Sequence, residues 1–369
     1  MDRPDDVLVI GAGPWGLATA WRAAQAGARV TLLDDGAPPA AAVAAGMLGH
    51  RSEAIESEDL LYRVLARAVG AWPGFADELT RAAGRDAGYR RSGAVLAATR
   101  PEHVPVIRRR LDTIAARGEP ARWLTPSRLR EIEPGLGTAL GGGADLPDEH
   151  QAEPRSLLEA LRAACAAAGV RIVAERAEAL VREPRVRGAL LGDGRTVRAE
   201  RVVLSAGWAA GRLASRVPVR PVKGQILRLR AAGGAPLPIA RSVRTPSVYL
   251  APRDGELVVG ATMEERSDTT VTAGAVADLL EEARRTVPEI AELELAEARA
   301  GLRPTTPDGL PALGEDTGDG LVWAAGGHRH GVLLTPLAAR AAVDAARGQA
   351  MPDWAAALSP CRFDAAEAA

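Results

Sequence analysis

The stretch VLVIGAGPWGLATAWRAAQAG at residues 7–27 decides the fold of this 369-residue chain. An apolar strand leads into Gly11, Gly13 and Gly16, and from these into a helix that stops near Gly27. The first glycine permits a tight turn, the second lets the backbone approach a pyrophosphate, and the third lets helix and strand pack closely. The stretch therefore predicts a dinucleotide-binding βαβ unit, with an ordinary turn of a parallel sheet as the alternative.

An acidic residue completes the unit. Residues 29–33 (RVTLL) form a second apolar run, and Asp34 follows it. This position lies about twenty residues after the glycines, where a carboxylate accepts the ribose hydroxyls of a dinucleotide. Because an acid there disfavours the 2′-phosphate of NADP, NAD and FAD both remain as cofactors at this point.

The segment after Asp34 is unusually small and uncharged. Residues 40–49 read AAAVAAGMLG, and charged residues such as Arg51 and Glu53 follow abruptly. Small side chains allow a flat ligand to approach the backbone closely. A low-complexity helix in an alanine-rich protein explains the composition equally well.

Composition limits the class of protein. The length and the 47% hydrophobic content suit a two-domain enzyme, and a net charge of -1 provides no field for nucleic acid or an anionic membrane. No apolar run approaches the roughly 20 residues that span a bilayer, and no export signal precedes the first strand. Cys165 and Cys361 are far apart and form no redox pair. We therefore expect a cytoplasmic protein with small partners.

The rest of the chain alternates between helices and strands before it changes character. A predominantly antiparallel sheet is expected over residues 219–261, and one continuous mixed sheet is the alternative to a two-domain division. The helices are expected at residues 59–84, 103–117, 126–133, 153–169 and 273–286, and further strands at 91–98, 170–173 and 202–204.

Several separate motifs occur in a fixed order. They are the residue 7–27 stretch, AAGMLG at 44–49, PVKGQ at 221–225, VYLAPR at 248–253, VVGATM at 258–263, GLRP at 301–304 with TPDGLP at 306–311, and GGHRHGVLLTP at 326–336. Together they resemble the D-amino-acid-oxidase-like family of FAD-dependent oxidoreductases, and most closely the glycine oxidases of thiamine biosynthesis.

The resemblance implies an α/β fold, α+β overall, in which a Rossmann-like FAD-binding domain carries an inserted substrate domain with a mixed or antiparallel β-sheet. The expected division assigns residues 1–84, 146–218 and 298–369 to the FAD-binding domain, the last including a C-terminal helix or tail. It assigns residues 85–145 and 219–297 to the substrate domain.

The resemblance also implies the activity. A non-covalently bound FAD would accept hydride at N5 from glycine or another small amino acid, yielding the 2-oxo acid (glyoxylate for glycine), ammonia and hydrogen peroxide with O2 as acceptor. The alternatives are a bulkier or N-substituted amino acid, a dehydrogenase that passes electrons to another acceptor, and a flavin-binding protein that has lost catalysis. Nucleic-acid and membrane partners are not expected, and relatives suggest a homo-oligomer, namely a tetramer.

On the substrate side, Arg303 and Tyr249 would hold the substrate carboxylate, because a guanidinium makes two parallel charge-assisted hydrogen bonds and a phenol adds a third. A surface arginine and a packed strand aromatic are the alternatives without a function. Met263 corresponds to a position above the flavin ring.

The chain departs from its relatives around Arg329. Glycine oxidases carry Gly-His-aromatic-Arg-Asn-Gly there, whereas this chain has GGHRHG at residues 326–331. Arg329 corresponds to the family arginine, and His328 and His330 are expected to be polar wall residues of the substrate pocket, with solvent-facing side chains as the alternative. Two histidines without a nearby carboxylate or cysteine cluster make no metal site, so no metal is expected.

The remaining carry-overs concern FAD. The turn at residues 331–333 would direct backbone N–H groups at the N1–C2=O edge of the flavin. The expected cofactor-binding residues are Gly11, Gly13, Gly16, Asp34, Ala45, Gly46, Met47, Ala206, Gly207, Gly331, Val332 and Leu333.

Overall fold

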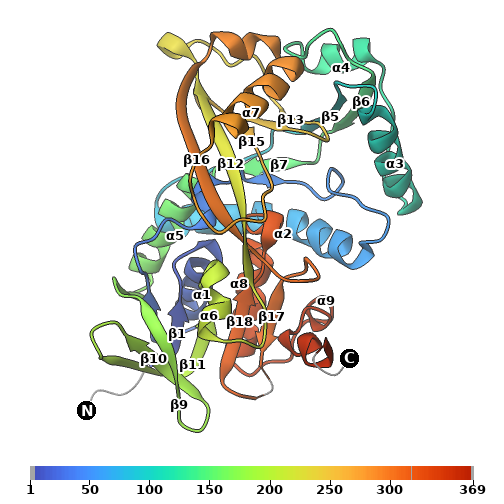
Figure 1. The fold of residues 1–369 in the computed structure, drawn as a ribbon. Coiled ribbons are helices and arrows are strands. Elements are labelled where there is room, and N and C mark those ends of the chain that lie inside the picture. The colour runs from blue at the N-terminus through green and yellow to red at the C-terminus, as the bar shows by residue number, and fades with distance from the viewer. Residues whose placement is uncertain (1–4, 317, 367–369) are drawn as a thin grey trace.

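The computed structural model describes residues 5–316 and 318–366. In Figure 1 one large sheet occupies the lower half of the molecule and a second the upper half. The long strands β12 (Arg220–Arg230) and β16 (Glu294–Thr305) run between the two halves. The α-helices are α1 (Pro14–Gln25), α2 (Asp59–Ala83), α3 (His103–Ala116), α4 (Pro126–Ile132), α5 (Pro154–Ala167), α6 (Ala210–Leu213), α7 (Ala273–Thr286), α8 (Thr335–Ala346) and α9 (Asp353–Ala356).

The lower sheet has a parallel centre. Its order is β17-β18-β11-β1-β2-β8, in which β18, β11, β1, β2 and β8 run parallel and β17 is antiparallel. A hairpin of β9 and β10 continues from β11. The bounds are β1 (Asp5–Ile10), β2 (Val30–Leu33), β8 (Arg171–Val173), β9 (Ala177–Arg182), β10 (Val186–Leu191), β11 (Thr196–Leu204), β17 (Ala312–Glu315) and β18 (Leu321–Ala325).

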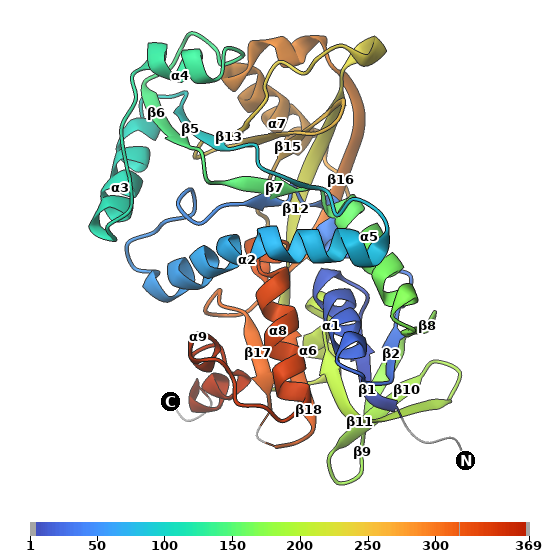
Figure 2. The same cartoon turned by 180° about the vertical axis from the view of Figure 1, so that it is seen from behind.

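Both faces of this sheet are buried. Val7 and Val9 of β1 join the core shared with α1, α2, α5 and α8, whereas Leu8 and Ile10 join the core on the opposite face. Alternate residues of a strand point to opposite faces, so a continuous apolar run marks a strand covered on both sides. Figure 2 shows α1 and α8 side by side over one face, with α2 and α5 above them.

The glycine turn has the predicted strand–turn–helix context. Gly11 has a φ of 107°, which favours glycine, and Pro14 begins α1 at a position where its missing N–H costs nothing. A Cβ on Gly16 would overlap the carbonyl oxygen of Gly11, and a Cβ on Gly11 would overlap the backbone at Ser205. These two glycines therefore let strand β1, helix α1 and the end of β11 pack at backbone contact.

The upper sheet is mixed and mostly antiparallel. Its order is β16-β12-β15-β14-β13-β5-β6, and only β13 and β5 pair in parallel. The remaining bounds are β5 (Ala94–Ala98), β6 (Gly142–Leu146), β13 (Ser242–Arg244), β14 (Tyr249–Pro252) and β15 (Glu256–Gly260). A three-stranded sheet of β3 (Met47–Leu48), β4 (Tyr89–Arg90) and β7 (His150–Ala152) lies at the level between the two large sheets in Figures 1 and 2.

The substrate-domain boundary expected between residues 297 and 298 falls inside β16. That strand pairs with β12 from Arg220↔Thr305 to Arg230↔Glu294, so it belongs along its length to the upper sheet. The GLRP motif resembles the glycine-rich style of the first domain, but ladder pairing with β12 makes it a strand. The division into FAD-binding and substrate domains stays a prediction.

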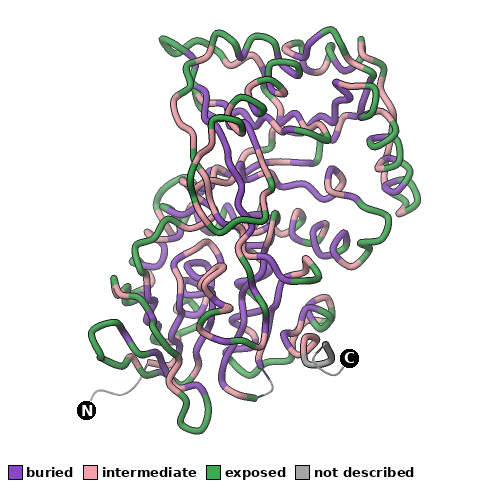
Figure 3. Tube along the Cα trace, in the orientation of Figure 1, coloured by how far each residue is buried: buried purple, intermediate pink, exposed green. Residues whose placement is uncertain are grey.

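The sheets have separate cores. One face of the upper sheet packs against α4 and α7, and α3 packs with β5 and β6 in a smaller cluster that includes Ile107 and Leu111. Figure 3 shows the buried segments following the strands and the exposed ones following the outer helix faces and loops. A single continuous mixed sheet, the alternative left open by the sequence, is therefore wrong.

Most local predictions agree with the structure. The five expected helices occur within two residues of their predicted ends. The alanine-rich segment is not a low-complexity helix: it forms a short 3-10 turn, η1 (Ala40–Val43), and then enters β3. No helix of the described ranges is long and apolar enough to cross a membrane.

Candidate active site

A cavity of about 1000 Å³ passes between the two large sheets. Its walls come from the carboxyl ends of β1, β2, β11 and β18, from the alanine-rich segment, and from β13, β14 and β16. It brings together all of the predicted site residues except one: Arg303, Tyr249, Arg329, Met263, His328, His330, Gly11, Gly13, Asp34, Ala45, Gly46, Met47, Ala206, Gly207, Gly331, Val332 and Leu333. The exception, Gly16, lies beneath the turn and supports it.

The lower end of the cavity suits a nucleotide. Gly13 has extended backbone, and the nearest atom to a Cβ placed on it is 3.8 Å away, so the bare backbone faces open space. Asp34 Oδ2 lies 2.8 Å from Arg162 Nη1, and Asp34 Oδ1 accepts from the Gly36 N–H at 3.1 Å. Because a carboxylate has about four acceptor positions, capacity remains for ribose hydroxyls. Arg162, which the sequence analysis missed, positions the carboxylate from α5.

The middle of the cavity is lined by small residues whose backbone is fixed by contacts with Ala152 and Arg253. Gly46 has a φ of 66°, and a Cβ on it would overlap the carbonyl oxygen of Ala152. Arg253 donates a hydrogen bond to the carbonyl oxygen of Ala45 and contacts Glu153 at 2.6 Å. The segment therefore presents fixed, nearly bare backbone to the cavity, as a flat ring system requires.

The turn after β18 is fixed by two tryptophans. Trp15 Nε1 donates to the Gly331 carbonyl at 2.6 Å, and Trp72 Nε1 donates to the Leu333 carbonyl at 2.8 Å. Helix α8 starts just beyond, at Thr335. The backbone of the turn is thus held at the cavity wall next to a helix N-terminus, where partial positive charge accumulates. Both tryptophans are distant in sequence from the turn, so the motif alone gave no signal of them.

Glycines on the neighbouring strands leave room for the side chains of Arg303 and Tyr249. Arg303 donates to the carbonyl oxygens of Lys223 at 3.1 Å and Thr262 at 3.0 Å, and its guanidinium lies where a Cβ on Gly224 would stand. The Tyr249 hydroxyl lies over Gly260 in the same way. Among the described residues Arg303 has no carboxylate partner and the Tyr249 hydroxyl has no hydrogen-bond partner. Burial lowers the pKa of Arg303 and raises the pKa of Tyr249, which stays protonated as a donor.

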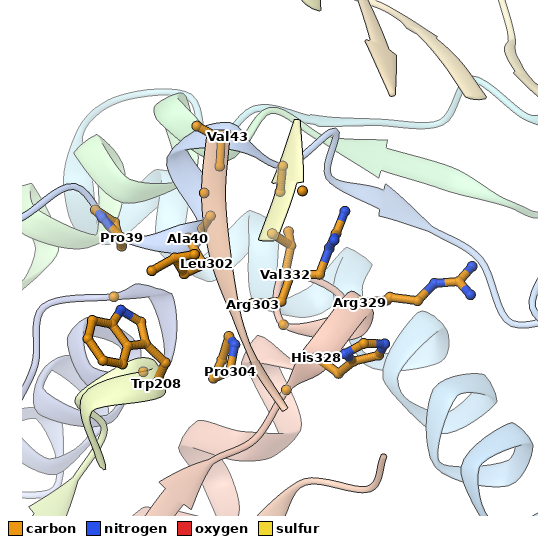
Figure 4. Close-up of a pocket in the computed structure, with 18 of the residues that line it drawn as sticks. Pro39, Ala40, Val43, Trp208, Leu302, Arg303, Pro304, His328, Arg329 and Val332 are labelled. Atoms are coloured by element: carbon orange, nitrogen blue, oxygen red, sulfur yellow. The ribbon is translucent and has the colours of Figure 1, made fainter. Parts of the chain in front are cut away.

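Arg329 belongs to a charged cluster that the sequence analysis did not foresee. Its Nη2 lies 2.6 Å from Glu53 Oε2, while Arg244 pairs with Glu53 Oε1 and also donates to Ser52. Burial opposes ionisation of Glu53, but Arg244 and Arg329 outweigh it and hold the carboxyl pKa below its ordinary value. In Figure 4 His328 and Arg329 lie to the right of β16, the strand that carries Arg303, and Pro39 and Trp208 lie to its left.

The two histidines next to Arg329 are neutral, His330 buried and His328 half-buried. His328 Nδ1 lies 2.8 Å from Thr305 Oγ1, and His328 adopts a positive φ of 41°, which is uncommon outside glycine. Burial, reinforced by nearby positive charge, lowers the pKa of each histidine to about 4. Neither is placed with a metal ligand set, since the described residues hold no group of three histidine, cysteine or acidic side chains that could bind a metal.

These two histidines predict a pH dependence of stability. The unfolded chain binds protons on them near pH 6.5 and the folded chain only near pH 4, so the free energy of unfolding falls as pH drops through this window. Across this pH window we expect each histidine to lower the free energy of unfolding by up to about 3 kcal/mol. The pH dependence is measured by urea unfolding of wild type and His330→Asn at neutral pH and near pH 4.5. Identical pH slopes in the two proteins would contradict the assignment.

The structure also places Met263 and the two cysteines relative to the cavity. Met263 lines the cavity but is 56% exposed, so it lies where the cavity opens to solvent. Cys165 is buried and donates to the Leu17 carbonyl, and Cys361 also lies outside the cavity wall, so neither is placed for covalent attachment of a flavin.

Comparisons with known proteins agree with this geometry. The family model described as "FAD dependent oxidoreductase" (DAO) matches residues 6–345. Glycine oxidase of Geobacillus kaustophilus is 35% identical over 345 residues, which is 90% of either chain. The bifunctional protein ThiO/ThiG of Synechocystis is 34% identical over 374 residues, and this chain spans 55% of its length.

Solved structures are similar along almost their full length. The crystal structure of the Geobacillus kaustophilus glycine oxidase has a TM-score of 0.91 at 32% identity, covering 98% of this chain and 99% of that chain. The iminodiacetate oxidase of Chelativorans has a TM-score of 0.86 at 27% identity, covering 96% and 98%.

Proposed function

Because this chain belongs to the FAD-dependent oxidoreductases of the DAO family, we propose that its cavity binds glycine or another small amino acid and oxidises it at the carbon–nitrogen bond. For glycine, the balanced reaction with O2 and water gives glyoxylate, ammonia and hydrogen peroxide. The observation that carries the proposal is an arginine without a carboxylate partner, Arg303, beside the unpaired hydroxyl of Tyr249 on one wall of the cavity, both among the described residues.

The chain is a flavoprotein by family, and its residues fit FAD. Gly11, Gly13 and Asp34 would hold the ADP portion, and the small segment around Gly46 would hold the ring against the turn at residues 331–333. When bound, FAD supplies a two-electron acceptor for the hydride that leaves the substrate Cα.

The protein's own contribution is to orient the substrate and keep its amine neutral. Arg303 and Tyr249 together offer three donors to a carboxylate, which fixes the attached Cα. The positive charges of Arg303, Arg329 and Arg244 disfavour an ammonium in the same cavity, so the substrate nitrogen loses its proton before its Cα–H bond breaks. A lone pair on nitrogen is what permits hydride to leave the carbon.

The test is reduction of the bound flavin without oxygen. Glycine, sarcosine and small D-amino acids are added anaerobically to purified holoenzyme while its visible absorbance is followed. Bleaching that air reverses with release of peroxide supports an amino acid oxidase, and slow reoxidation in air indicates a different acceptor. Failure of every amine to bleach the flavin would overturn the proposal.

Tyr249→Phe tests the second donor to the carboxylate. A hydrogen bond to a charged group contributes about 1.5–3 kcal/mol, so we expect kcat/KM for glycine to fall about 10- to 100-fold. The FAD content of the purified protein serves as the control, because the hydroxyl has no partner among the described residues that its loss would disturb. Unchanged kcat/KM would show that Tyr249 is a packed strand aromatic.

The Chelativorans oxidase is named for iminodiacetate, an amine with two carboxylates, whereas glycine has one. The number of carboxylates that this chain's substrate carries depends on the charged side chains of its own cavity wall.

A further inference from the structure

The cavity carries more positive charge than one substrate carboxylate can neutralise. Four of the arginines that line it belong to its substrate end: Arg110 from α3, Arg244 from β13, Arg303 from β16 and Arg329 from the turn after β18. On this part of the wall, among the described residues, Glu53 is the acidic side chain, and its two oxygens are engaged by Arg244 and Arg329. The buried Glu149, outside the wall, also attracts Arg110 and Arg244. The histidines beside them are neutral at pH 7. The four guanidinium groups outnumber these two carboxylates, so this wall keeps a net positive charge.

Arg110 stands out among the four. It reaches the cavity from α3, next to the stripe of Ile107 and Leu111 that packs with β5 and β6. Its Nε is buried and has no hydrogen-bond partner, and within residues 5–316 and 318–366 no carboxylate forms an ion pair with it. A half-buried guanidinium with a buried, unpartnered Nε is costly, so its presence on a cavity wall indicates an anion that the ligand supplies.

Electrostatics place Arg110 with the cluster around Glu53. Burial lowers the pKa of Arg110, as do Arg244 and Arg329, whereas Glu53 and Glu149 raise it. Two carboxylates, Glu53 and Glu149, act on three guanidinium groups, and one oxygen of Glu149 is taken by the Ser52 N–H, so the cluster has spare donors for bound anions. Arg303 is held separately, on the backbone carbonyls of Lys223 and Thr262.

We propose that the cavity has a second anion subsite, formed by Arg110, Arg244 and Arg329 around Glu53, and that the substrate is an amine carrying two carboxylates. This inference rests on the proposed function, in which Arg303 and Tyr249 bind the first carboxylate. The second carboxylate is carried on the amine nitrogen, as in iminodiacetate, or on the side chain, as in aspartate. For iminodiacetate, oxidation with one O2 and one water gives glyoxylate, glycine and hydrogen peroxide.

Binding of redox-inert ligands tests the subsite independently of turnover. Diglycolate has the two carboxylates of iminodiacetate but an ether oxygen in place of the amine, and methoxyacetate has one carboxylate. Titrated into oxidised holoenzyme and followed by the visible flavin spectrum, diglycolate is expected to bind at least about tenfold more tightly, as a charge-assisted hydrogen bond provides.

The variant Arg110→Gln should abolish most of that preference. Arg109→Gln is the matched control, because Arg109 is the preceding residue of α3 and is exposed outside the cavity. Equal affinities for the two ligands in wild type, or a preference that survives in Arg110→Gln, would overturn the proposal.

Steady-state oxygen consumption then distinguishes the two sources of the second carboxylate. We expect kcat/KM for iminodiacetate or for D-aspartate to exceed that for glycine and sarcosine, and the ratio to fall at least about tenfold in Arg110→Gln but not in Arg109→Gln. Glycine turnover without any preference for a diacid would refute the second subsite and leave the proposed function standing. Tight diglycolate binding without turnover of any amine would support the second subsite and refute the proposed function.

Discussion

Replacing Arg303 with methionine is expected to lower kcat/KM for carboxylate-bearing amines by about 30- to 5,000-fold, since removing one partner of a desolvated charge pair costs about 2–5 kcal/mol. The half-buried Arg303, among the described residues, has only backbone carbonyls as hydrogen-bond partners and no carboxylate in an ion pair, so its charge is available to the substrate. Methionine has similar length and keeps the apolar packing of the stem.

The measurement is steady-state kinetics with a series of amines, together with the FAD content of each variant. Arg230→Met is the matched control, because Arg230 lies on the neighbouring strand β12, is half-exposed, and pairs with Glu256 away from the cavity. A loss confined to Arg303→Met, and absent for an amine without a carboxylate, supports the anchor. If efficiency on carboxylate-bearing amines stays within a few-fold of wild type, Arg303 does not bind the carboxylate.

The lower half of the molecule was predictable because its signals are local. The turn at Gly11, the helix that follows and the acid at Asp34 lie within one short stretch, and strand–helix alternation continues from it. Arg303 and Tyr249 could be named because a resemblance marked their motifs. Neither composition nor spacing separates them from other arginines and tyrosines.

The charged cluster could not be predicted in the same way. Glu53 comes from the segment before α2, Arg110 from the middle of α3 and Arg244 from β13. Each is an ordinary charged residue in its own neighbourhood, and only the packing of α3 and β13 over the cavity brings them together. The roles of Gly224 and Gly260 could not be predicted for the same reason, because each leaves space for a side chain from another strand.

The largest effect on cofactor binding is expected from Gly16→Ala. The added methyl would overlap the carbonyl oxygen of Gly11, which is backbone and cannot swing aside as a side chain would. Helix α1 must therefore move away from the turn whose geometry would hold the pyrophosphate. We expect the free energy of unfolding to fall by about 3 kcal/mol, with a Tm lower by about 5–10 °C, and the FAD affinity to drop at least about tenfold.

Gly70→Ala separates this steric effect from the general effect of adding a methyl group to a helix. Gly70 lies inside α2 with no atom within 4 Å of the added Cβ, so alanine should stabilise the protein by about 0.5–1 kcal/mol. Thermal unfolding and the fluorescence of released flavin report both quantities for each variant. Because the two substitutions are chemically identical and both lie within helices, a Gly16→Ala protein that keeps its FAD and unfolds at the temperature of Gly70→Ala would show that close packing of α1 on Gly11 is not what builds the nucleotide site.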